Sequence, residues 1–187
     1  MARAAAEAAE QAGAEVRLRK VHELAPKEAI ESNEGWSRHA LETQDVPEAS
    51  LEDLEWADVL VLGSPTRYGL PTAQLKQFID TTGPLWAQGK LVNKVATSFT
   101  STGTAHGGQE TTITAINNTF YHWGAIIVPP GYADPIQFQA GNPYGASHIS
   151  NNGANPPGET ELAAVRFQTR RATEIGAALK RGMAAAS

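Results

Sequence analysis

The stretch ADVLVLGSPTRYGLP, residues 57–71, places an unbroken apolar run directly before a loop of unusual composition. The run has no polar–apolar alternation, and a strand of that kind is usually covered on both faces, as in a parallel sheet. A hydroxyl, a proline, a cation, a phenol and a glycine follow where the strand ends. Ligands of open parallel sheets bind beyond the carboxyl ends of the strands. The stretch therefore predicts a buried parallel strand over residues 58–63, followed by a candidate ligand-binding loop.

Helical and strand patterns alternate along the rest of the chain. The patterns predict helices over residues 1–13, 50–54, 72–80, 109–123 and 159–186, and further strands over residues 15–21, 92–99 and 125–128. Such alternation, with helices long enough to cross over a sheet, is typical of a doubly wound α/β fold. We expect one domain over residues 1–187, because single cores commonly occupy ~100–200 residues.

Three segments are less regular than these elements. Residues 15–21 alternate charged and apolar side chains, which predicts a strand with one wet face near a sheet edge. Residues 22–50 have no sustained period and contain two prolines, so we expect a long irregular connection with room for a short helix. Residues 130–158 are rich in Gly, Asn and Pro and are expected to be irregular.

Composition excludes several classes of function. Fifteen Lys and Arg against twenty Asp and Glu give a net charge of −5, which disfavours nucleic acid as the main ligand. There is no cysteine, and no histidine has an i, i+4 partner or a carboxylate cluster, so we expect no metal site. Ser64 and Ser101 lack the G-x-S-x-G elbow of hydrolases. With no leader-like or membrane-spanning apolar run, we expect a cytoplasmic protein.

A second loop, residues 100–108, is expected at the same edge of the sheet as the first. It carries four hydroxyls and three glycines just before a helix, and free N–H groups there favour anionic or electron-rich atoms. Helix caps and turns use the same residue types, so this loop alone has a purely structural alternative. In the first loop, Tyr68 offers a flat ring for stacking and Arg67 offers a fixed cation. A planar, partly anionic cofactor would satisfy both loops.

Two further side chains have both a structural and a functional interpretation. His122 ends the helix opened by the second loop, and it either caps that helix or reaches the site. Trp86 follows the helix opened by the first loop, and it either fills the core or lines the site.

Seven short segments carry a family resemblance. They are GSPTRYG at residues 63–69, TGPLW at 82–86, STGT at 101–104, GGQETT at 107–112, HWG at 122–124, PGY at 130–132 and NPYG at 142–145. Their order over almost the whole chain resembles the WrbA-type NAD(P)H:quinone oxidoreductases, which are flavodoxin-like proteins. The resemblance implies a five-stranded sheet of order 2-1-3-4-5, non-covalently bound FMN, and a homotetramer.

The resemblance also assigns roles to residues of this chain. The residues implied along the flavin ring are Pro65, Thr66, Arg67, Tyr68 and Gly69. Those implied on its other side and along the ribityl chain are Ser101, Thr102, Gly103, Thr104 and Gly107. His122 is the implied catalytic residue and also a cofactor contact, and Trp86, Tyr68 and Tyr144 are the implied substrate contacts, with Tyr144 reaching in from a neighbouring subunit.

One part of the family pattern is missing from this chain. Flavodoxin-like chains begin with a strand and a loop that wraps the FMN phosphate, whereas this sequence opens in the first helix. The missing strand would lie between residues 15–21 and 58–63, so we expect two strand edges without a neighbour there. We expect Met1 to be an internal methionine of a longer protein.

The implied reaction is the two-electron reduction of a quinone by NADH or NADPH, in ping-pong fashion through N5 of the flavin. Two alternatives remain open. One is a flavodoxin-like electron carrier that serves a redox protein. The other is a non-enzymatic oligomeric interaction module that does not hold FMN.

Overall fold

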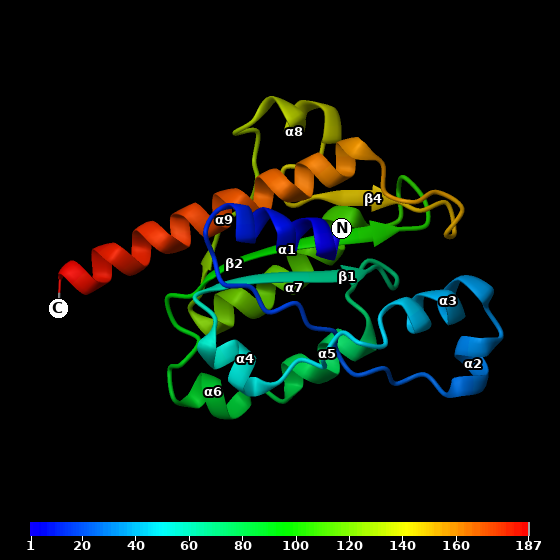
Figure 1. The fold of residues 1–187 in the computed structure, drawn as a ribbon, viewed down its shortest axis with the longest axis horizontal. Coiled ribbons are helices and arrows are strands. Elements are labelled where there is room, and N and C mark those ends of the chain that lie inside the picture. Colours follow the sequence, from blue (N-terminus) through cyan, green and yellow to red (C-terminus); the bar gives the residue numbers. More distant parts are fainter. Residues whose placement is uncertain (187) are drawn as a thin grey trace.

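The computed structural model describes residues 1–186 and contains a parallel sheet between two groups of helices (Figure 1). The helices are α1 (Ala2–Gln11), α2 (Lys27–Glu31), α3 (Glu34–Glu42), α4 (Leu51–Trp56), α5 (Ala73–Asp80), α6 (Gly83–Ala87), α7 (Gln109–Trp123), α8 (Pro135–Ala140) and α9 (Glu159–Ala185). The strands are β1 (Val59–Pro65), β2 (Val95–Thr102), β3 (Ile126–Ile127) and β4 (Ser147–Ile149).

Strand β2 is the centre of the sheet. It pairs in parallel with β1 along its whole length, from Val59 opposite Val95 to Pro65 opposite Ser101. Its other edge pairs in parallel with two short pieces, β3 near its start and β4 near its end. The segment between these two pieces leaves the sheet and carries α8. The predicted α/β fold with a parallel sheet is confirmed.

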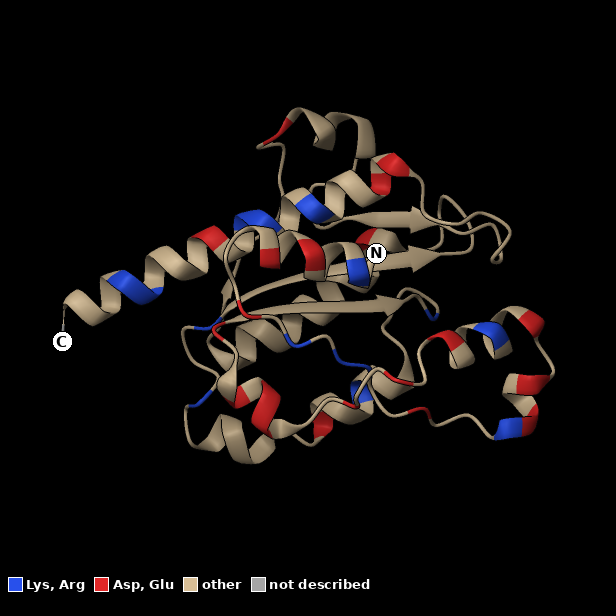
Figure 2. Cartoon of the chain, in the orientation of Figure 1, with Lys and Arg blue, Asp and Glu red and all other residues tan. Residues whose placement is uncertain are grey.

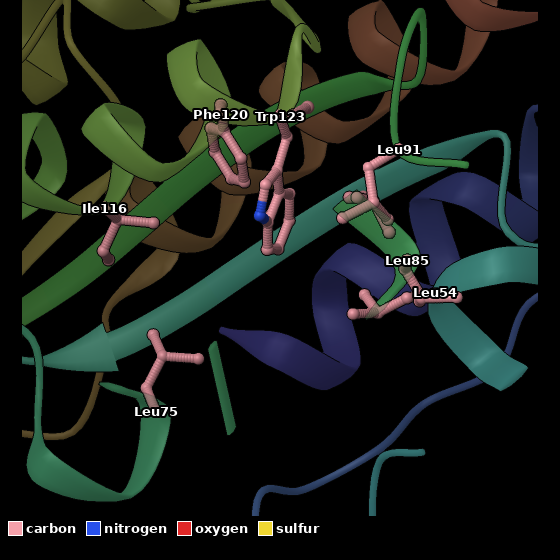
Figure 3. Packing of buried hydrophobic residues seen from close by; sticks show 9 residues of the cluster. Leu54, Leu75, Leu85, Leu91, Ile116, Phe120 and Trp123 are labelled. Atoms are coloured by element: carbon pink, nitrogen blue, oxygen red, sulfur yellow. The ribbon is translucent and has the colours of Figure 1, made fainter. Parts of the chain in front are cut away.

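Each face of the sheet has its own apolar core. On one face, α4, α5, α6 and α7 bury a cluster against β1 and β2 that includes Leu75, Phe120 and Trp123 (Figure 3). On the other face, α1 and α9 pack on the sheet through small residues such as Ala5 and Ala164. The strands carry no charged side chain, and the charges lie on helices and loops (Figure 2).

Gln168 of α9 is the main polar link between this second face and the sheet. Its side chain is fully buried. Its amide nitrogen donates to Thr97 Oγ1 at 2.6 Å and to the Ser98 carbonyl at 2.8 Å, and its amide oxygen accepts from the Ala146 N–H at 2.6 Å. One glutamine therefore joins α9, β2 and the residue just before β4.

Some predicted boundaries are correct and others need correction. Helix α7 has the predicted bounds, between Gly108 and Gly124, which both have positive φ. The strand predicted over residues 92–99 runs instead over β2, because residues 92–93 belong to the turn that precedes it. The strand predicted over residues 125–128 shortens to β3. Residues 22–50 hold two short helices, α2 and α3, and residues 130–158 hold α8 and β4.

The strand predicted over residues 15–21 is wrong. These residues are extended, but within the described chain they form only an isolated parallel bridge between Lys20 and Glu48. A strand needs a neighbour for its backbone groups, and the adjacent edge of β1 is separated from this segment by a cavity. The alternation therefore predicted the faces of the segment correctly but not its pairing.

Asp53 fixes this extended segment to α4. It accepts from Arg17 at 3.1 Å and from Arg19 at 2.9 Å, and it forms a capping box with Ser50 at the start of α4. Burial raises the pKa of Asp53, but hydrogen bonds from Arg19, Arg17 and the Ser50 backbone outweigh it and hold the pKa below its ordinary value. The carboxylate form is thus favoured in the folded chain.

Replacing Asp53 by asparagine is expected to lower the free energy of unfolding by about 1–2 kcal/mol at neutral pH. Because the folded pKa is depressed, the stabilisation is present above the unfolded value near ~4 and is lost as pH falls through the folded value. Urea unfolding of both proteins at pH 7 and near pH 3 checks this. A difference between the two proteins that stays constant over this range would contradict the assignment.

The described helices include none that is both long and apolar enough to span a bilayer.

Candidate functional site

The two predicted loops meet at the carboxyl edge of the sheet. Their strands are neighbours, with Pro65 opposite Ser101, and the Thr66 N–H donates to the Ser101 carbonyl at 2.9 Å. Farther along, the Thr112 hydroxyl of α7 donates to Thr66 Oγ1 at 2.8 Å. The first loop, the end of β2 and the start of α7 are thereby one connected unit.

The first loop contains a tight two-residue turn. The N–H groups of Arg67 and Leu70 each donate to the other residue's carbonyl, at 2.8 and 3.0 Å, and both residues between them have positive φ. Positive φ at both central positions is the requirement of a type I′ turn. Gly69 meets it without strain, whereas Tyr68 at φ 55 does so against the preference of a bulky residue. The turn holds the Tyr68 ring fully in solvent.

The two loops touch through glycines. A Cβ on Gly108 would lie 2.8 Å from Gly69 Cα and 2.9 Å from Thr111 Oγ1, and a Cβ on Gly69 would lie 2.8 Å from the same hydroxyl. At Gly108 the blocking atoms include backbone, so a side chain does not fit there, whereas at Gly69 a Cβ would press on the Thr111 side chain. At this contact the backbones of the two loops form one continuous surface, which lies beside Tyr68.

Hydroxyl groups stiffen the second loop from within. Thr102 Oγ1 donates to the Thr104 carbonyl at 2.9 Å and accepts from the Gln109 amide at 3.2 Å, and the Gly107 N–H donates to the Thr104 carbonyl at 3.1 Å. A Cβ on Gly103 would approach Asn152 Oδ1 to 3.0 Å. These contacts fix the loop without a bound group.

His148 also lies in this region, although no motif of the sequence points to it. It lies on β4 opposite Ser101 and is 95% buried, and its Nδ1 is 2.9 Å from Ser101 Oγ. In the described part of the chain its Nε2 has no hydrogen-bond partner. No sequence pattern marks this pair, because β4 is three residues long within a Gly- and Asn-rich segment.

Replacing His148 by leucine is expected to weaken FMN binding by roughly fivefold, since the Ser101 hydroxyl loses a hydrogen bond worth about 1 kcal/mol. Asparagine places a polar atom near the position of Nδ1 and should recover most of this loss. Titration of FMN fluorescence measures the affinities, and urea unfolding separates them from stability. Equal affinities for the leucine and asparagine variants would remove His148 from the site.

Trp86 and His122 lie together, but away from the two loops. The Trp86 indole N–H donates to the His122 carbonyl at 3.0 Å, and the Trp86 ring is 59% exposed. His122 is at the C-terminal end of α7, while the loops are at its N-terminal end, about 20 Å away along the helix. Within one chain the structure therefore does not bring these residues to Tyr68.

Tyr144 is also outside the loop surface. It precedes β4, on the far side of β2 from the first loop, and is half-exposed. Near it in the chain, Tyr132 and Phe138 form an exposed aromatic pair with ring centroids 5.0 Å apart.

The loop surface suits a flat group of modest negative charge. Arg67 is the one cation of residues 64–70, and residues 101–109 contain no Asp, Glu, Lys or Arg. The glycine contact lets a ring approach the backbone closely, and Tyr68 offers a stacking face. The residues expected to hold the flavin ring thus fit that group. Over residues 1–186, no three His, Cys, Asp or Glu side chains gather as a metal site would require.

Comparisons with known proteins agree on one family. The family model "NADPH-dependent FMN reductase" matches residues 1–138. The NAD(P)H dehydrogenase (quinone) of Deinococcus radiodurans is 49% identical over 180 residues, which cover 96% of this chain and 89% of that protein. The protein of the same name from Sinorhizobium fredii is 44% identical over 185 residues, covering 96% and 90%.

Solved structures support the fold. The flavodoxin, WrbA-like protein from Agrobacterium tumefaciens superposes with a TM-score of 0.54 at 20% identity, over 68% of this chain and 71% of that chain. An oxidoreductase from Corynebacterium diphtheriae gives a TM-score of 0.51 at 17% identity, over 96% and 84%.

Proposed function

Because this chain belongs to the NADPH-dependent FMN reductase family, we propose that it reduces quinones by two electrons at the expense of NAD(P)H, with FMN as cofactor. Its relatives named NAD(P)H dehydrogenase (quinone) support this reaction. FMN held by these loops would supply the chemistry of hydride transfer from NAD(P)H and of two-electron reduction of the quinone.

The contact between Gly69 and Gly108 is the observation that carries the proposal. It joins two loops from neighbouring strands into one backbone surface at the edge where ligands of parallel sheets bind. A cap or turn that served folding alone would not need a second loop so close that a Cβ on Gly108 would lie 2.8 Å from Gly69 Cα. The residues proposed to hold FMN are Pro65, Thr66, Arg67, Tyr68, Gly69, Ser101, Thr102, Gly103, Thr104 and Gly107.

Each proposed contact has a definite physical task. Arg67 brings positive charge to the rim of the surface and stabilises an electron-rich ring edge. The N–H groups of Thr66, Arg67, Gly69 and Leu70 already donate within the protein, which leaves the Tyr68 N–H of the turn to donate to a ring acceptor. The Tyr68 ring would cover the face on which nicotinamide or quinone stacks. The absence of a carboxylate from residues 64–70 and 101–109 avoids repulsion of an anionic group.

We further propose that a homotetramer completes the site. Trp86, His122 and Tyr144 are exposed, and none lies at the loop surface of its own chain. A second copy that brings its Trp86 and His122 against Tyr68 would enclose a quinone on both sides. His122 would then be a catalytic residue towards the substrate of a neighbouring subunit.

The reaction is tested by FMN titration followed by NADH and NADPH oxidation with a quinone acceptor. Saturable FMN binding and quinone-dependent oxidation without a stable one-electron flavin radical support the enzyme. Accumulation of that radical on photoreduction, with slow quinone turnover, would favour the electron carrier. Failure to bind FMN at all would favour the interaction module.

Mixing two inactive variants tests the shared site. Trp86→Ala and Gly69→Val are each expected to lower quinone turnover by about 10- to 100-fold. In co-expressed random mixtures, about one quarter of the sites combine an intact loop with an intact partner tryptophan, so activity should return to that level. Mixtures that remain as inactive as the separate variants would show that each chain works alone.

A further inference from the structure

The loop between β4 and α9 contains Asn152 followed by Gly153, which is the one Asn-Gly step in the sequence. Asn151, Asn152 and Gly153 all have positive φ, and all three are exposed. The Gly153 N–H donates to the Ser150 carbonyl at 2.9 Å, so residues 150–153 form a tight turn with the two asparagines at its centre. None of the residues proposed to hold FMN belongs to this turn.

This turn is attached to the second loop of the candidate site. The Ser150 N–H and the Ser150 hydroxyl both donate to the Thr102 carbonyl, at 2.8 and 3.1 Å. A Cβ on Gly103 would lie 3.0 Å from Asn152 Oδ1, so the Asn152 amide lies against the Gly103 backbone. Figure 1 shows the two loops next to each other, beyond the ends of β2 and β4. A change of charge at Asn152 would therefore act directly on residues proposed to hold FMN.

An Asn-Gly step holds both groups of an internal cyclisation. The Gly153 nitrogen attacks Cγ of Asn152 and closes a five-membered succinimide ring. The bond from Cγ to Nδ2 breaks, and the amide nitrogen leaves as ammonia with the proton that the Gly153 nitrogen gives up. Water then opens the ring at one of its two carbonyls and yields aspartate or isoaspartate, each with one new negative charge. Glycine favours the attack because it has no Cβ beside the attacking nitrogen.

The turn itself controls the rate of this reaction. The hydrogen bond from the Gly153 N–H to the Ser150 carbonyl opposes the attack, so the turn has to open first. Opening costs little free energy here, because residues 151–155 are all exposed and bury no apolar side chain. A ligand that orders the second loop also holds the turn closed through Ser150, so it should slow the reaction.

We propose that Asn152 is a site of spontaneous deamidation, and that the carboxylate formed there weakens the binding of FMN. Residues 101–109 contain no Asp or Glu, so the modification places an acidic group against a loop that has none. FMN is an anion, and a like charge beside its loop repels it. The effect on FMN rests on the proposed function, whereas the deamidation depends on this chain alone.

Asn93 is the matched control for the reaction, because it is exposed and has a φ of 64 but is followed by Lys94. The purified protein is kept at mildly alkaline pH with and without FMN, and peptide mapping by mass spectrometry follows both asparagines. We expect Asn152 to convert at least roughly tenfold faster than Asn93, and saturating FMN to slow the conversion of Asn152 by at least about threefold. Equal rates at the two asparagines would overturn the deamidation site, whether or not the protein binds FMN.

Charge variants test the effect on FMN. Asn152→Asp reproduces one product and is expected to weaken FMN binding by roughly fivefold at low salt, and by less at high salt. Asn93→Asp adds the same charge before the opposite end of β2 and should leave the affinity unchanged. Asn152→Gln keeps the amide and should retain its FMN affinity throughout the incubation.

Two results would count against the link to FMN. Equal FMN affinities of the two aspartate variants, in a protein whose unmodified form binds FMN, would overturn the link and leave the proposed function intact. An unmodified protein that binds no FMN would overturn the proposed function and the link together, while the rates at Asn152 and Asn93 would still decide the deamidation.

Discussion

Replacing Gln168 by leucine is expected to lower the free energy of unfolding by about 3–5 kcal/mol. Leucine fills a similar volume, so the loss comes from hydrogen bonds rather than from a cavity. It leaves the Thr97 hydroxyl, the Ser98 carbonyl and the Ala146 N–H without this partner in a fully buried place. Urea unfolding followed by circular dichroism measures the change. If the folded protein is only marginally stable, the leucine variant would show no cooperative unfolding transition.

Gln77→Leu is the matched control for this substitution. Gln77 lies on an exposed face of α5, so its replacement should change the free energy of unfolding by less than about 0.5 kcal/mol. Similar losses in the two variants would mean that Gln168 does not join α9 to β2. Thr97→Val, which removes one of the three partners, should give an intermediate loss.

Gly108→Ala is expected to lower quinone turnover by about 100-fold and FMN affinity by at least roughly tenfold. The new Cβ would lie 2.8 Å from the Gly69 backbone, and backbone cannot rotate away as a side chain can. The two loops must therefore move apart, and the surface that they share is lost. FMN fluorescence titration and steady-state NAD(P)H oxidation measure the two effects.

Gly131→Ala separates this contact from backbone strain. Gly131 also has positive φ, but a Cβ there meets nothing within 4 Å. Both alanine variants should therefore lose about 1 kcal/mol of stability through strain, while only the Gly108 variant loses FMN affinity. Comparable loss of affinity in both would show that strain, and not the loop contact, governs binding.

The sequence predicts best those helices and strands whose ends are marked by neighbouring residues in the chain. Helix α7 has the predicted bounds, and in the structure a glycine with positive φ stands at each end of it. Residues 15–21 had an equally clear alternation, but a strand depends on a partner that alternation does not report. Strand β4 was missed for the opposite reason: it has three residues in an irregular segment, and it exists because β2 offers a free edge.

The part of the candidate site that depends only on the order of the strands could be predicted from the sequence. Two loops that follow neighbouring parallel strands must share an edge, so their meeting could be expected from strand order alone. The Ser101–His148 pair could not, because it depends on the unpredicted register of β4. The separation of His122 from the loops could have been predicted, because a 15-residue helix that starts at one edge of a sheet ends at the other.

The salt bridges from Arg17 and Arg19 to Asp53 hold residues 14–19 in place, so acid should affect this segment before it unfolds the sheet. Once Asp53 is protonated, Arg17 and Arg19 lose their anchor while the β1–β2 ladder keeps its hydrogen bonds. Residues 14–19 should then detach while the sheet is still folded. Their detachment would expose the apolar edge of β1 that does not pair with β2. An uncovered edge of this kind templates pairing between molecules. Acid should therefore drive the chain towards fibrous or amorphous aggregates while its helical signal is still largely intact, with Asp53 setting the pH of onset.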